Sequence, residues 1–479
     1  MFHNENSKFA LSISTGIKRL EVSFKDFHVH FVGVSGIGLS AVAYISLQMG
    51  LRVSGCSDEE NEQTEMLKKS GMRYNFKHHP SHVEGSSLVV RSAAVPDDNE
   101  EIQAAKDLKI PVLYYSEYLG ILMAQKIGIG VAGTHGKTTT TGMLSEILSE
   151  AELSPTIVCG GVLNRFGSNA VYGHGDFFIT EACEYKRNFL DLPRYYSIVT
   201  NIEAEHLDYY KDLDDILSAF RAYIQSSKLK TIVNGDDRNI SRIVSSENIK
   251  NVVKVGYSDT CDYRICDVLV DNGHYSFRLA SENCKTERIR LSVPGKFNVE
   301  NAALAAACSF EIGVAEEPIV SGLTNYRGTK RRLEVLLENE NIIVYSDYAH
   351  HPTEIIRTIS TLRELHPEEK ILVVFQPHQY SRTKIFLREF SEVLSNADGV
   401  ILMEIYGQRD SEETKRSISI VDLFELLRKR IKNSVYCTYS ERELLKIFSD
   451  NNLLGFFSVI IFMGAGSIDD VARRFVRKL

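Results

Sequence analysis

The stretch VAGTHGKTTTT, residues 131–141, combines the residue types that hold a nucleotide phosphate. Two glycines let backbone N–H groups approach an anion, because no Cβ stands in the way. Lys137 supplies a positive charge for the β- and γ-phosphates, and the Thr138 hydroxyl is a suitable Mg²⁺ ligand. The general phosphate-loop pattern requires glycine at position 131, however, and this chain has valine there. The stretch by itself leaves two interpretations open, a nucleotide site and a chance Gly-Lys-Thr before a core helix.

Acidic residues downstream of the loop favour the nucleotide site. The apolar run FFIT ends at Glu181, with Glu184 just beyond it, and the run SIVTNI leads into Glu203, Glu205 and His206. Oxygen ligands at strand ends beside a phosphate loop suit a magnesium ion that also binds phosphates. For any one of these acids, a solvated loop position remains the alternative, and a lone histidine is more often structural.

The elements that must position these residues follow a βα pattern. Short apolar runs alternate with longer amphipathic stretches, which is typical of parallel sheets covered by helices. Most runs stop at a turn with polar residues, the place where open α/β sheets bind ligands. We therefore expect an α/β fold, with the strand pattern restarting near residues 125 and 329. Buried strands are expected at residues 28–34, 126–133, 341–347, 371–376, 399–406 and 458–466.

Length and composition exclude several classes of protein. The 479 residues exceed one typical core, and 43% hydrophobic with 25% charged residues is ordinary for a globular protein. A net charge of −8 without a long basic run argues against a nucleic-acid partner. The eight cysteines form no C-x-x-C pair, so neither a zinc motif nor a disulfide framework is indicated. No apolar run reaches the roughly 20 residues of a membrane span, and the N-terminal 25 residues lack a signal-peptide core. We expect a cytoplasmic protein without a membrane partner.

A second glycine loop, GVSGIG at residues 33–38, follows the first expected strand. Asp58 lies twenty residues after Gly38, at the end of the next expected strand, where dinucleotide-binding folds place an acid that binds a ribose. Taken alone, this loop predicts a nicotinamide-dependent oxidoreductase. That interpretation gives no role to Lys137 and Thr138. A nucleotide-binding regulator without catalysis is a further alternative.

Six motifs in order resemble the Mur ligases of bacterial cell-wall synthesis: AGTHGKTTTT, TNIEAEHLDYY, GKFNVENAALAA, RGTKRRLE, DYAHHPTEI and FQPHQYSRT. The resemblance extends from about residue 28 to about residue 468, and the family's shorter loop, G-x-x-G-K-[ST], fits Gly133 to Thr138. It implies three domains after an N-terminal extension. These are a Rossmann-like UDP-sugar domain, a central P-loop ATPase-type α/β domain, and a C-terminal Rossmann-like domain that binds the amino acid. The expected ranges are 1–27 for the extension, then 28–125, 126–328 and 329–479.

The resemblance also implies an activity, the ATP-dependent joining of a carboxylate and an amine through an acyl phosphate. The motifs are most similar to those of members that add L-alanine to UDP-N-acetylmuramate, a cytoplasmic step of peptidoglycan synthesis. The alternative within the family is the attachment of a recycled tripeptide to the same sugar, and VGVSGIGLSAVA favours the alanine reaction. ATP and Mg²⁺ are the implied cofactors, and a monomer or homodimer is expected.

Residue roles follow from the matched motifs. Lys137, Glu181, His206 and His350 are the implied catalytic residues, and Thr138, Glu181 and His206 are the implied metal ligands. Asn301 is preferred over Asn298 for adenine, because an amide offers both a donor and an acceptor. His135 faces either the phosphates or the lactyl carboxylate, or it only shapes the loop. The full implied ATP set is Gly133, Thr134, His135, Gly136, Lys137, Thr138, Thr139, Asn301 and Arg331.

The two ends of the substrate pair have their own implied residues. UDP-sugar contacts are expected from Gly36, Ile37, Gly38, Ser57, Asp58, Ser92 and Asn99. The amino-acid and acyl end is expected to use Tyr348, His350, His378 and Arg382, the last pairing with a carboxylate or acyl phosphate. Three departures from the family pattern concern this end: Gln379 where arginine is common, Ser467 where an acid is common, and the segment 406–413, in which Arg409 is a candidate replacement charge.

Overall fold

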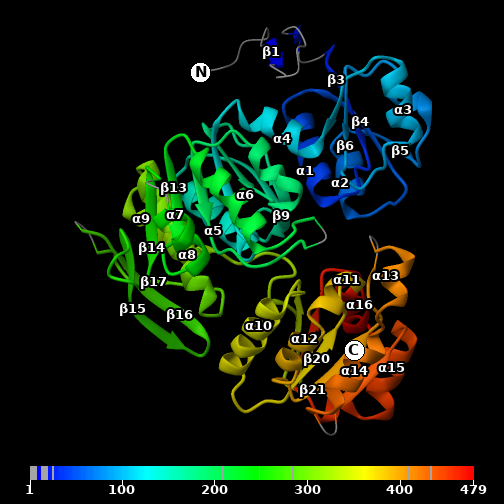
Figure 1. The fold of residues 1–479 in the computed structure, drawn as a ribbon, viewed down its shortest axis with the longest axis vertical. Helices are drawn as coiled ribbons and strands as arrows, with labels where there is room; N and C mark the ends of the chain where they lie inside the picture. The colour runs from blue at the N-terminus through cyan, green and yellow to red at the C-terminus, as the bar shows by residue number, and fades with distance from the viewer. Residues whose placement is uncertain are drawn as a thin grey trace. The chain divides into compact units, whose positions relative to one another are not determined.

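The protein is seen here in a computed structural model that describes residues 8–11, 20–23, 26–207, 209–246, 249–282, 285–407, 410–431 and 434–479. Three larger sheets carry the fold, and helices flank each of them (Figure 1). The chain forms two compact units. The first comprises residues 1–265, 279–286 and 301–323, and the second comprises residues 266–278, 287–300 and 324–479. The division passes through the strands β15 (Tyr263–Asp271) and β16 (His274–Ala280) of the central sheet and through the helices α8 (Phe297–Ile312) and α9 (Glu316–Asn325).

The N-terminal sheet has five parallel strands in the order β5-β4-β3-β6-β7. Its elements are β3 (His28–Val32), α1 (Ile37–Gln48), β4 (Arg52–Ser57), α2 (Glu62–Lys69), β5 (Arg73–Phe76), η2 (Pro80–Val83), β6 (Leu88–Arg91), α3 (Glu100–Asp107), β7 (Val112–Tyr114) and α4 (Tyr115–Met123). All five residues of β3 are buried, as expected for a central strand covered on both faces. Val29 and Phe31 pack with α1 and α4, whereas Val32 packs with α3.

The expected N-terminal extension contains an element that the sequence pattern did not predict. Two short strands, β1 (Lys8–Leu11) and β2 (Leu20–Ser23), pair antiparallel.

The central sheet places the phosphate-loop strand between the two acid-bearing strands. Its order is β10-β9-β11-β8-β12-β13-β14-β15-β16-β17. β8 pairs in parallel with both β11 and β12, so the carboxyl ends of all three strands lie at one edge of the sheet. The strands are β8 (Ile127–Ala132), β9 (Thr156–Leu163), β10 (Ser168–Val171), β11 (Phe177–Glu181), β12 (Tyr196–Val199), β13 (Lys230–Asn234), β14 (Val252–Gly256), β15 (Tyr263–Asp271), β16 (His274–Ala280) and β17 (Ile289–Arg290). The helices are α5 (Lys137–Glu150), η3 (Tyr185–Asp191), α6 (Leu213–Gln225), α7 (Arg238–Ser246), α8 (Phe297–Ile312) and α9 (Glu316–Asn325).

The C-terminal sheet has the strand order β18-β19-β23-β20-β21-β22, and only its edge pair β18–β19 is antiparallel. The strands are β18 (Glu334–Glu338), β19 (Ile343–Asp347), β20 (Ile371–Phe375), β21 (Gly399–Met403), β22 (Val435–Thr438) and β23 (Val459–Met463). The helices are α10 (Pro352–Leu365), α11 (Tyr380–Ile385), α12 (Leu387–Leu394), α13 (Glu412–Arg416), α14 (Ile420–Arg428), α15 (Glu441–Asp450), η4 (Leu453–Gly455) and α16 (Ile468–Val476).

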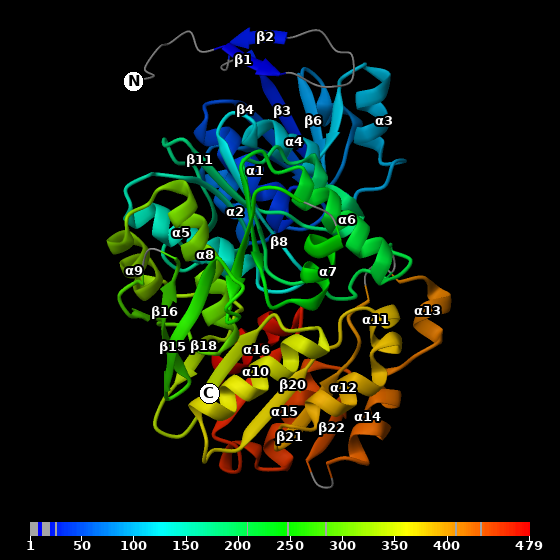
Figure 2. The same cartoon turned by 60° about the vertical axis from the view of Figure 1, so that its left-hand side comes forward.

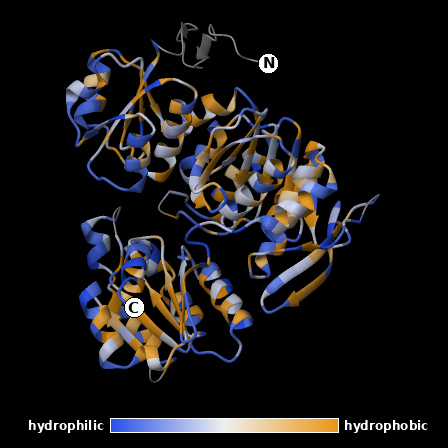
Figure 3. Cartoon of the chain, turned by 180° about the vertical axis from the view of Figure 1, so that it is seen from behind, coloured by the Kyte–Doolittle hydropathy of each residue, from blue (hydrophilic) through white to orange (hydrophobic). Residues whose placement is uncertain are grey.

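Strand β20 is apolar at every position, and its packing explains why. Val373 and Phe375 pack with α10, α12 and α14 on one face, and Leu372 and Val374 pack with α15 and α16 on the other. Both faces are therefore covered, and no position is left for a polar residue. Figure 2 shows α10, α12 and α14 lying over this sheet, and Figure 3 shows its strands hydrophobic while its helices carry both colours.

Within the described part of the chain, no helix combines the length and the apolar character needed to cross a membrane.

Candidate active site

The loop after β8 requires glycine at two positions. Gly133 has φ +136°, and a Cβ there would lie 2.0 Å from Oγ1 of Thr200. Gly136 has φ +84°, and its Cβ would lie 2.5 Å from Oδ1 of Asn301. Side chains rarely adopt such backbone angles, and neither position has space for one. Val131 is the penultimate residue of β8. The position where the general loop pattern has glycine therefore lies in the strand, where valine fits.

Lys137 begins α5 and turns its ammonium group back into the loop. Nζ donates hydrogen bonds to the carbonyl oxygens of Gly133 and Thr134 (3.0 Å to Thr134) and lies 3.1 Å from Oε2 of Glu184. Burial on its own would lower the pKa of Lys137, but the charge of Glu184 outweighs it and raises that pKa above the usual value. The ammonium group therefore stays charged at the centre of the loop.

Glu184 is the acid that the structure brings to the lysine. Its carboxylate is nearly fully buried and lies 3.1 Å from Nζ of Lys137 and 3.8 Å from Nε2 of His206, so it faces both side chains. Its backbone carbonyl accepts a hydrogen bond of 2.5 Å from the Tyr210 hydroxyl. Glu181 points elsewhere, because its Oε1 accepts from the Gly160 N–H at 2.5 Å and from the Cys159 thiol at 3.3 Å.

His206 is held in an uncommon conformation. Its φ is +55°, in a region that residues other than glycine seldom adopt. Its ring packs against that of Tyr185, with centroids 4.9 Å apart, and its carbonyl oxygen accepts the N–H groups of Tyr209 and Tyr210. Such strain at a non-glycine residue is common at ligand sites.

His135 acts first on the shape of the loop. Its backbone N–H donates to Oδ1 of Asn201 at 2.9 Å, and its carbonyl accepts from the Thr200 hydroxyl at 2.6 Å. These bonds tie the loop to the segment that follows β12. The ring Nε2 lies 3.4 Å from a carboxylate oxygen of Glu203, so the side chain faces an acid.

Asn301 connects α8 to the loop. Its Oδ1 accepts a hydrogen bond of 3.3 Å from the Thr140 hydroxyl, on the first turn of α5. Asn298 differs, because its amide donates to the Pro294 carbonyl at 2.7 Å, four residues back. Asn301 is therefore the amide of the two that lies against the phosphate loop.

The N-terminal loop has the same strand–glycine–helix form, but Ile37 follows its second glycine where Lys137 follows Gly136. Gly33 has φ +84°, and a Cβ there would lie 2.9 Å from Val95. The Ser35 hydroxyl lies 2.6 Å from that of Ser57 at the end of β4, and the Asp58 side chain beyond it is 70% exposed. Gly38 lies against the Tyr115 ring: a Cβ added to Gly38 would lie 3.0 Å from a carbon of that ring.

Two predicted sugar contacts have structural tasks in the same domain. The Asn99 side chain caps α3, with Oδ1 accepting from the N–H groups of Glu101 (3.0 Å) and Ile102 (3.4 Å). The Ser92 hydroxyl accepts from the Ala94 N–H at 3.3 Å. These bonds account for a polar residue at each position, and a substrate contact there stays a prediction.

In the second unit the four residues predicted for the amino-acid end lie together. The Tyr348 and His350 rings are 5.4 Å apart, the His350 and His378 rings are 6.2 Å apart, and Arg382 approaches Nδ1 of His378 to 3.2 Å. His378 also stacks on Tyr406 with centroids 5.8 Å apart.

Arg331 is fixed beside this group. Its guanidinium donates to the carbonyls of Gly464 (2.9 Å) and Gly466 (3.1 Å) and lies over the Tyr348 ring. Nearby, burial raises the pKa of Asp347 to about 6, although Arg332 opposes the shift.

Some of the residues that depart from the family pattern at the predicted amino-acid end have a local structural role. Gln379 has φ +71° and is the N-cap residue that precedes α11, and Asp410 accepts the N–H groups of the next two residues, Tyr380 and Ser381. The Ser467 hydroxyl lies 3.4 Å from the Gln376 side-chain nitrogen. Arg409 lies outside the described residues.

Three segments match known family descriptions: residues 28–127 the "Mur ligase family, catalytic domain", residues 131–309 the "Mur ligase middle domain", and residues 331–466 the "Mur ligase, glutamate ligase domain". The chain belongs to the Mur ligase family. The family membership predicted from the six motifs is confirmed.

Curated relatives of this Mur ligase cover almost its whole length. The UDP-N-acetylmuramate–L-alanine ligase of Agathobacter rectalis is 38% identical over 95% of this chain and 98% of its own. The enzyme of the same name from Aquifex aeolicus is 37% identical over 94% of this chain and 97% of its own.

Solved structures confirm the predicted three-domain α/β fold. The UDP-N-acetylmuramate–alanine ligase of Thermotoga maritima superposes with a TM-score of 0.79 at 30% identity, covering 94% of this chain and 98% of its own. A murein peptide ligase from Psychrobacter arcticus, at 21% identity, has the same fold with a TM-score of 0.70 over 94% of this chain and 98% of its own.

Sequence reasoning about this Mur ligase missed one residue. Glu184 was noted only as an acid beyond a strand, yet it is the carboxylate that contacts Lys137 and faces His206. The signal available was its position three residues after Glu181, but no spacing rule says which of two acids in a loop turns toward a lysine on another element.

Proposed function

We propose that this Mur ligase joins L-alanine to the carboxylate of UDP-N-acetylmuramate, with ATP converted to ADP and phosphate. The observation that supports this most strongly is the similarity, over 95% of the chain, to relatives that carry this activity in their names. The family membership leaves no support for a nicotinamide-dependent oxidoreductase.

The chemistry needs an activated carboxylate, because a free carboxylate is a poor electrophile for an amine. Transfer of the γ-phosphoryl group to the sugar's lactyl carboxylate forms an acyl phosphate and releases ADP. Attack by the amine of alanine then forms the amide, releases phosphate and gives up a proton. The protein contributes mainly by positioning the reactants and stabilising charge.

Lys137 is the residue assigned to the β- and γ-phosphates. Its ammonium group is charged and held in the loop by two carbonyls and Glu184. Glu184 has two roles in this proposal: it keeps the lysine protonated, and it orients His206. Thr134, His135 and Thr139 complete the loop, and Asn301 binds adenine from α8.

Mg²⁺ fits the donors at this edge of the central sheet. The Thr138 hydroxyl and the Glu181 carboxylate are hard oxygen donors, which this ion prefers. Thr138 lies in α5, which follows β8, and Glu181 is the last residue of the neighbouring strand β11. His206 is the third member of the proposed set. When bound, the ion neutralises phosphate charge.

The N-terminal domain is assigned to the UDP-sugar, with the Gly36–Gly38 turn, Ser57 and Asp58 as its contacts, and Ser92 and Asn99 as weaker candidates. In the second unit, Arg382 is proposed to pair with the alanine carboxylate or the acyl phosphate, as a guanidinium does with planar anions. Tyr348, His350 and His378 line the same place, and Arg331 is proposed to bind ATP.

Three further properties belong to the proposal. The domain boundaries are residues 28, 126 and 329, the enzyme acts in the cytoplasm, and it is a monomer or homodimer. Neither nucleic acid nor a membrane is a proposed partner. Size measurement in solution tests the oligomeric state.

A phosphate-release assay tests the function. With UDP-N-acetylmuramate, ATP and Mg²⁺, each of the twenty amino acids is supplied in turn, and the product mass is measured. We expect release only when both the sugar and L-alanine are present, with a product heavier by one alanyl residue. Release supported by a tripeptide but by no single amino acid would instead assign the enzyme to recycling. A change in dinucleotide absorbance without phosphate release would overturn the ligase proposal.

A further inference from the structure

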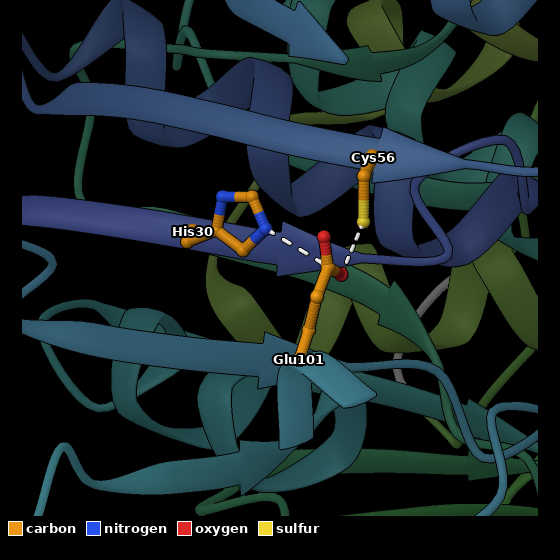
Figure 4. Close-up of side chains that lie close together, drawn as sticks. All are labelled: His30, Cys56 and Glu101. Carbon is orange, nitrogen blue, oxygen red and sulfur yellow. Dashed lines mark hydrogen bonds and ion pairs between the residues drawn. The ribbon is translucent and has the colours of Figure 1, made fainter. Parts of the chain in front are cut away.

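A buried group of histidine, cysteine and glutamate side chains lies in the N-terminal domain, and the proposed ligase reaction does not use it. His30 on β3, Cys56 on β4 and Glu101 on α3 are fully buried, and one ligand atom from each lies within 4.8 Å of the others (Figure 4). The register explains two of them: Cys56 pairs with Val32, two residues after His30, so both side chains lie on the face that α3 covers. Glu101, in the first turn of α3, completes the group from that helix.

Glu101 is surrounded by donors. Its Oε2 accepts from the Cys56 thiol at 2.6 Å and from Nδ1 of His78 at 2.9 Å, and its Oε1 accepts from Nδ1 of His82 at 2.6 Å. Nδ1 of His78 also lies 3.2 Å from the Cys56 sulfur. His78 therefore contacts two of the three central residues.

His30 supplies the observation that points to a ligand. Its Nε2 is buried, lies 3.8 Å from Oε2 of Glu101, and has no hydrogen-bond partner among the described residues. A buried polar atom without a partner is rare, because losing its hydration costs roughly 1–3 kcal/mol.

The hydrogen-bond chain behind His30 links its tautomer to that of His28. When Nδ1 of His28 donates to the Gly85 carbonyl at 3.3 Å, Nε2 of His28 accepts from the Ser54 hydroxyl at 2.7 Å. Ser54 then accepts from Nδ1 of His30 at 2.7 Å. In neutral His30, Nε2 consequently turns a lone pair toward the Glu101 carboxylate. Two electron-rich atoms face each other there, which is the arrangement that a cation between them stabilises.

The Cys56 thiol donates to Oε2 of Glu101 at 2.6 Å, so in the metal-free protein the thiol proton lies between sulfur and carboxylate.

We propose that this group is a structural site for one divalent first-row transition-metal ion of the zinc class, bound by Nε2 of His30, the sulfur of Cys56, the carboxylate of Glu101 and Nδ1 of His78. Two imidazoles, a thiolate and a carboxylate form a four-coordinate set of the kind that Zn²⁺ takes. The thiol proton leaves to solvent as the metal–sulfur bond forms, so a dication with one thiolate and one carboxylate has no net charge.

Binding requires small movements. In a tetrahedral site with Zn–S about 2.3 Å and Zn–O about 2.0 Å, sulfur and oxygen lie about 3.5 Å apart. The Cys56–Glu101 contact opens from 2.6 Å, and the 3.8 Å between His30 and Glu101 closes slightly. His78 must carry its proton on Nε2, and Asp58, 3.6 Å from that nitrogen, is placed to accept it. A carboxylate behind a ligating histidine is the usual outer partner of a metal site.

The site connects segments that are far apart in the sequence. It joins β3, β4, α3 and the segment that precedes η2. Cys56 immediately precedes Ser57 and Asp58 in the chain. It adds to the ligase proposal without depending on it, because binding is measured in the absence of both substrates.

Titration of the metal-free full-length protein with Co²⁺ tests the site. Co²⁺ occupies zinc sites, and a thiolate ligand produces a charge-transfer absorption in the near ultraviolet. We expect this absorption to saturate at one equivalent, to disappear on addition of Zn²⁺, and to persist in excess Mg²⁺. A wild-type protein that shows no such absorption overturns the proposal.

Variants identify the ligands. Cys56→Ala is expected to abolish the thiolate absorption, whereas Cys308→Ala, which removes another buried free thiol, is expected to leave it unchanged. If the absorption survives in Cys56→Ala, or is lost in Cys308→Ala, the assignment is wrong.

His30→Gln keeps a polar side chain in place of the imidazole. It tests the ligand set independently if Cys56→Ala does not fold. We expect at least a tenfold loss of Co²⁺ affinity in His30→Gln, and a rise in melting temperature on adding Zn²⁺ that is seen in the wild type alone. Unchanged affinity in a folded His30→Gln protein contradicts the proposed ligand set.

Discussion

The loops after β3 and β8 are built alike, and they differ in what surrounds them. Each follows a buried parallel strand, each has a glycine with positive φ at its first position, and each leads into a helix. The loop at 133–136 is followed by Lys137, whose ammonium group is held by Glu184. The loop at 33–36 is followed instead by Ile37, and its Ser35 hydroxyl lies against that of Ser57.

This difference shows that the backbone of a glycine loop indicates an anion site but not which anion binds. A helix N-terminus with free N–H groups accepts any phosphate. A lysine and acids on neighbouring strands add what phosphoryl transfer needs, namely charge neutralisation at atoms that change charge. Hydroxyl groups provide binding alone. We therefore expect substitutions in the two loops to separate catalysis from sugar binding.

Lys137→Ala is expected to have the largest effect. Removing the ammonium group leaves the β- and γ-phosphates without their main charge partner, and we expect kcat to fall about 10³-fold or more. Phosphate release under saturating substrates measures it. Lys69→Ala, which removes an exposed lysine from the N-terminal domain, is the control. If Lys137→Ala retained more than about a tenth of the wild-type rate, the assignment of catalysis to the loop at 133–136 and of binding alone to the loop at 33–36 would be wrong.

Glu184→Gln tests the partner of the lysine. The amide keeps the shape but removes the charge that faces Lys137 and His206, and we expect kcat to fall about 10²-fold with little change in the Mg²⁺ requirement. Glu181→Gln is the matched comparison, and it is expected to raise the Mg²⁺ concentration needed for half-maximal rate. Identical responses to Mg²⁺ in both variants would mean that the two acids do not have separate roles.

Gly133→Ala and Gly33→Ala compare the loops directly. Each forces alanine into positive φ, at a cost of about 1–3 kcal/mol, and Gly133→Ala also brings Cβ to 2.0 Å from Thr200. We expect Gly133→Ala to weaken ATP binding about 10-fold and Gly33→Ala to weaken UDP-sugar binding by a similar factor. Calorimetric titration with each ligand separates them. Loss of both ligands in either variant would indicate general unfolding instead of a local effect.

Asp58→Asn should give the smallest effect. The side chain is exposed, and an exposed charge contributes little, so we expect KM for the UDP-sugar to rise a few-fold while KM for ATP and kcat stay unchanged. Steady-state kinetics with each substrate varied in turn provides the measurement. A fall in kcat comparable to that of Glu184→Gln would give Asp58 a role in catalysis. It would then contradict the view that the N-terminal loop region serves only to bind the sugar.

The strands were predictable because their signal is local. The run ILVVF at 371–375 is apolar throughout, and both of its faces are buried, so the pattern and the packing state the same requirement. The phosphate-loop prediction for residues 133–138 rests on a related local signal: the two glycines, the lysine and the threonine lie close together in the sequence, and the predicted chemistry depends on their order. The paired strands β1 and β2 were not predicted, because segments of four residues are too short to show a periodic pattern.

The side-chain partners were less predictable. The role of His135 stayed open in the sequence, and its backbone bonds to Asn201 and Thr200 became visible only once β8 and β12 lay side by side. The absence of a C-x-x-C pair argued against a zinc motif, yet Cys56 meets His30 and Glu101 in the fold. Motif spacing reports only ligands that are close in sequence.

The sequence by itself determined the α/β fold and the Mur ligase family, and it predicts phosphate chemistry for residues 133–138, because each is encoded in contiguous residues. The tertiary structure decided that Glu184 and not Glu181 contacts Lys137, and it assembled the buried cluster around Glu101. The physical reason is the same in both cases. A carboxylate's partner depends on which elements the sheets bring within about 3–4 Å, a distance over which sequence separation carries no information.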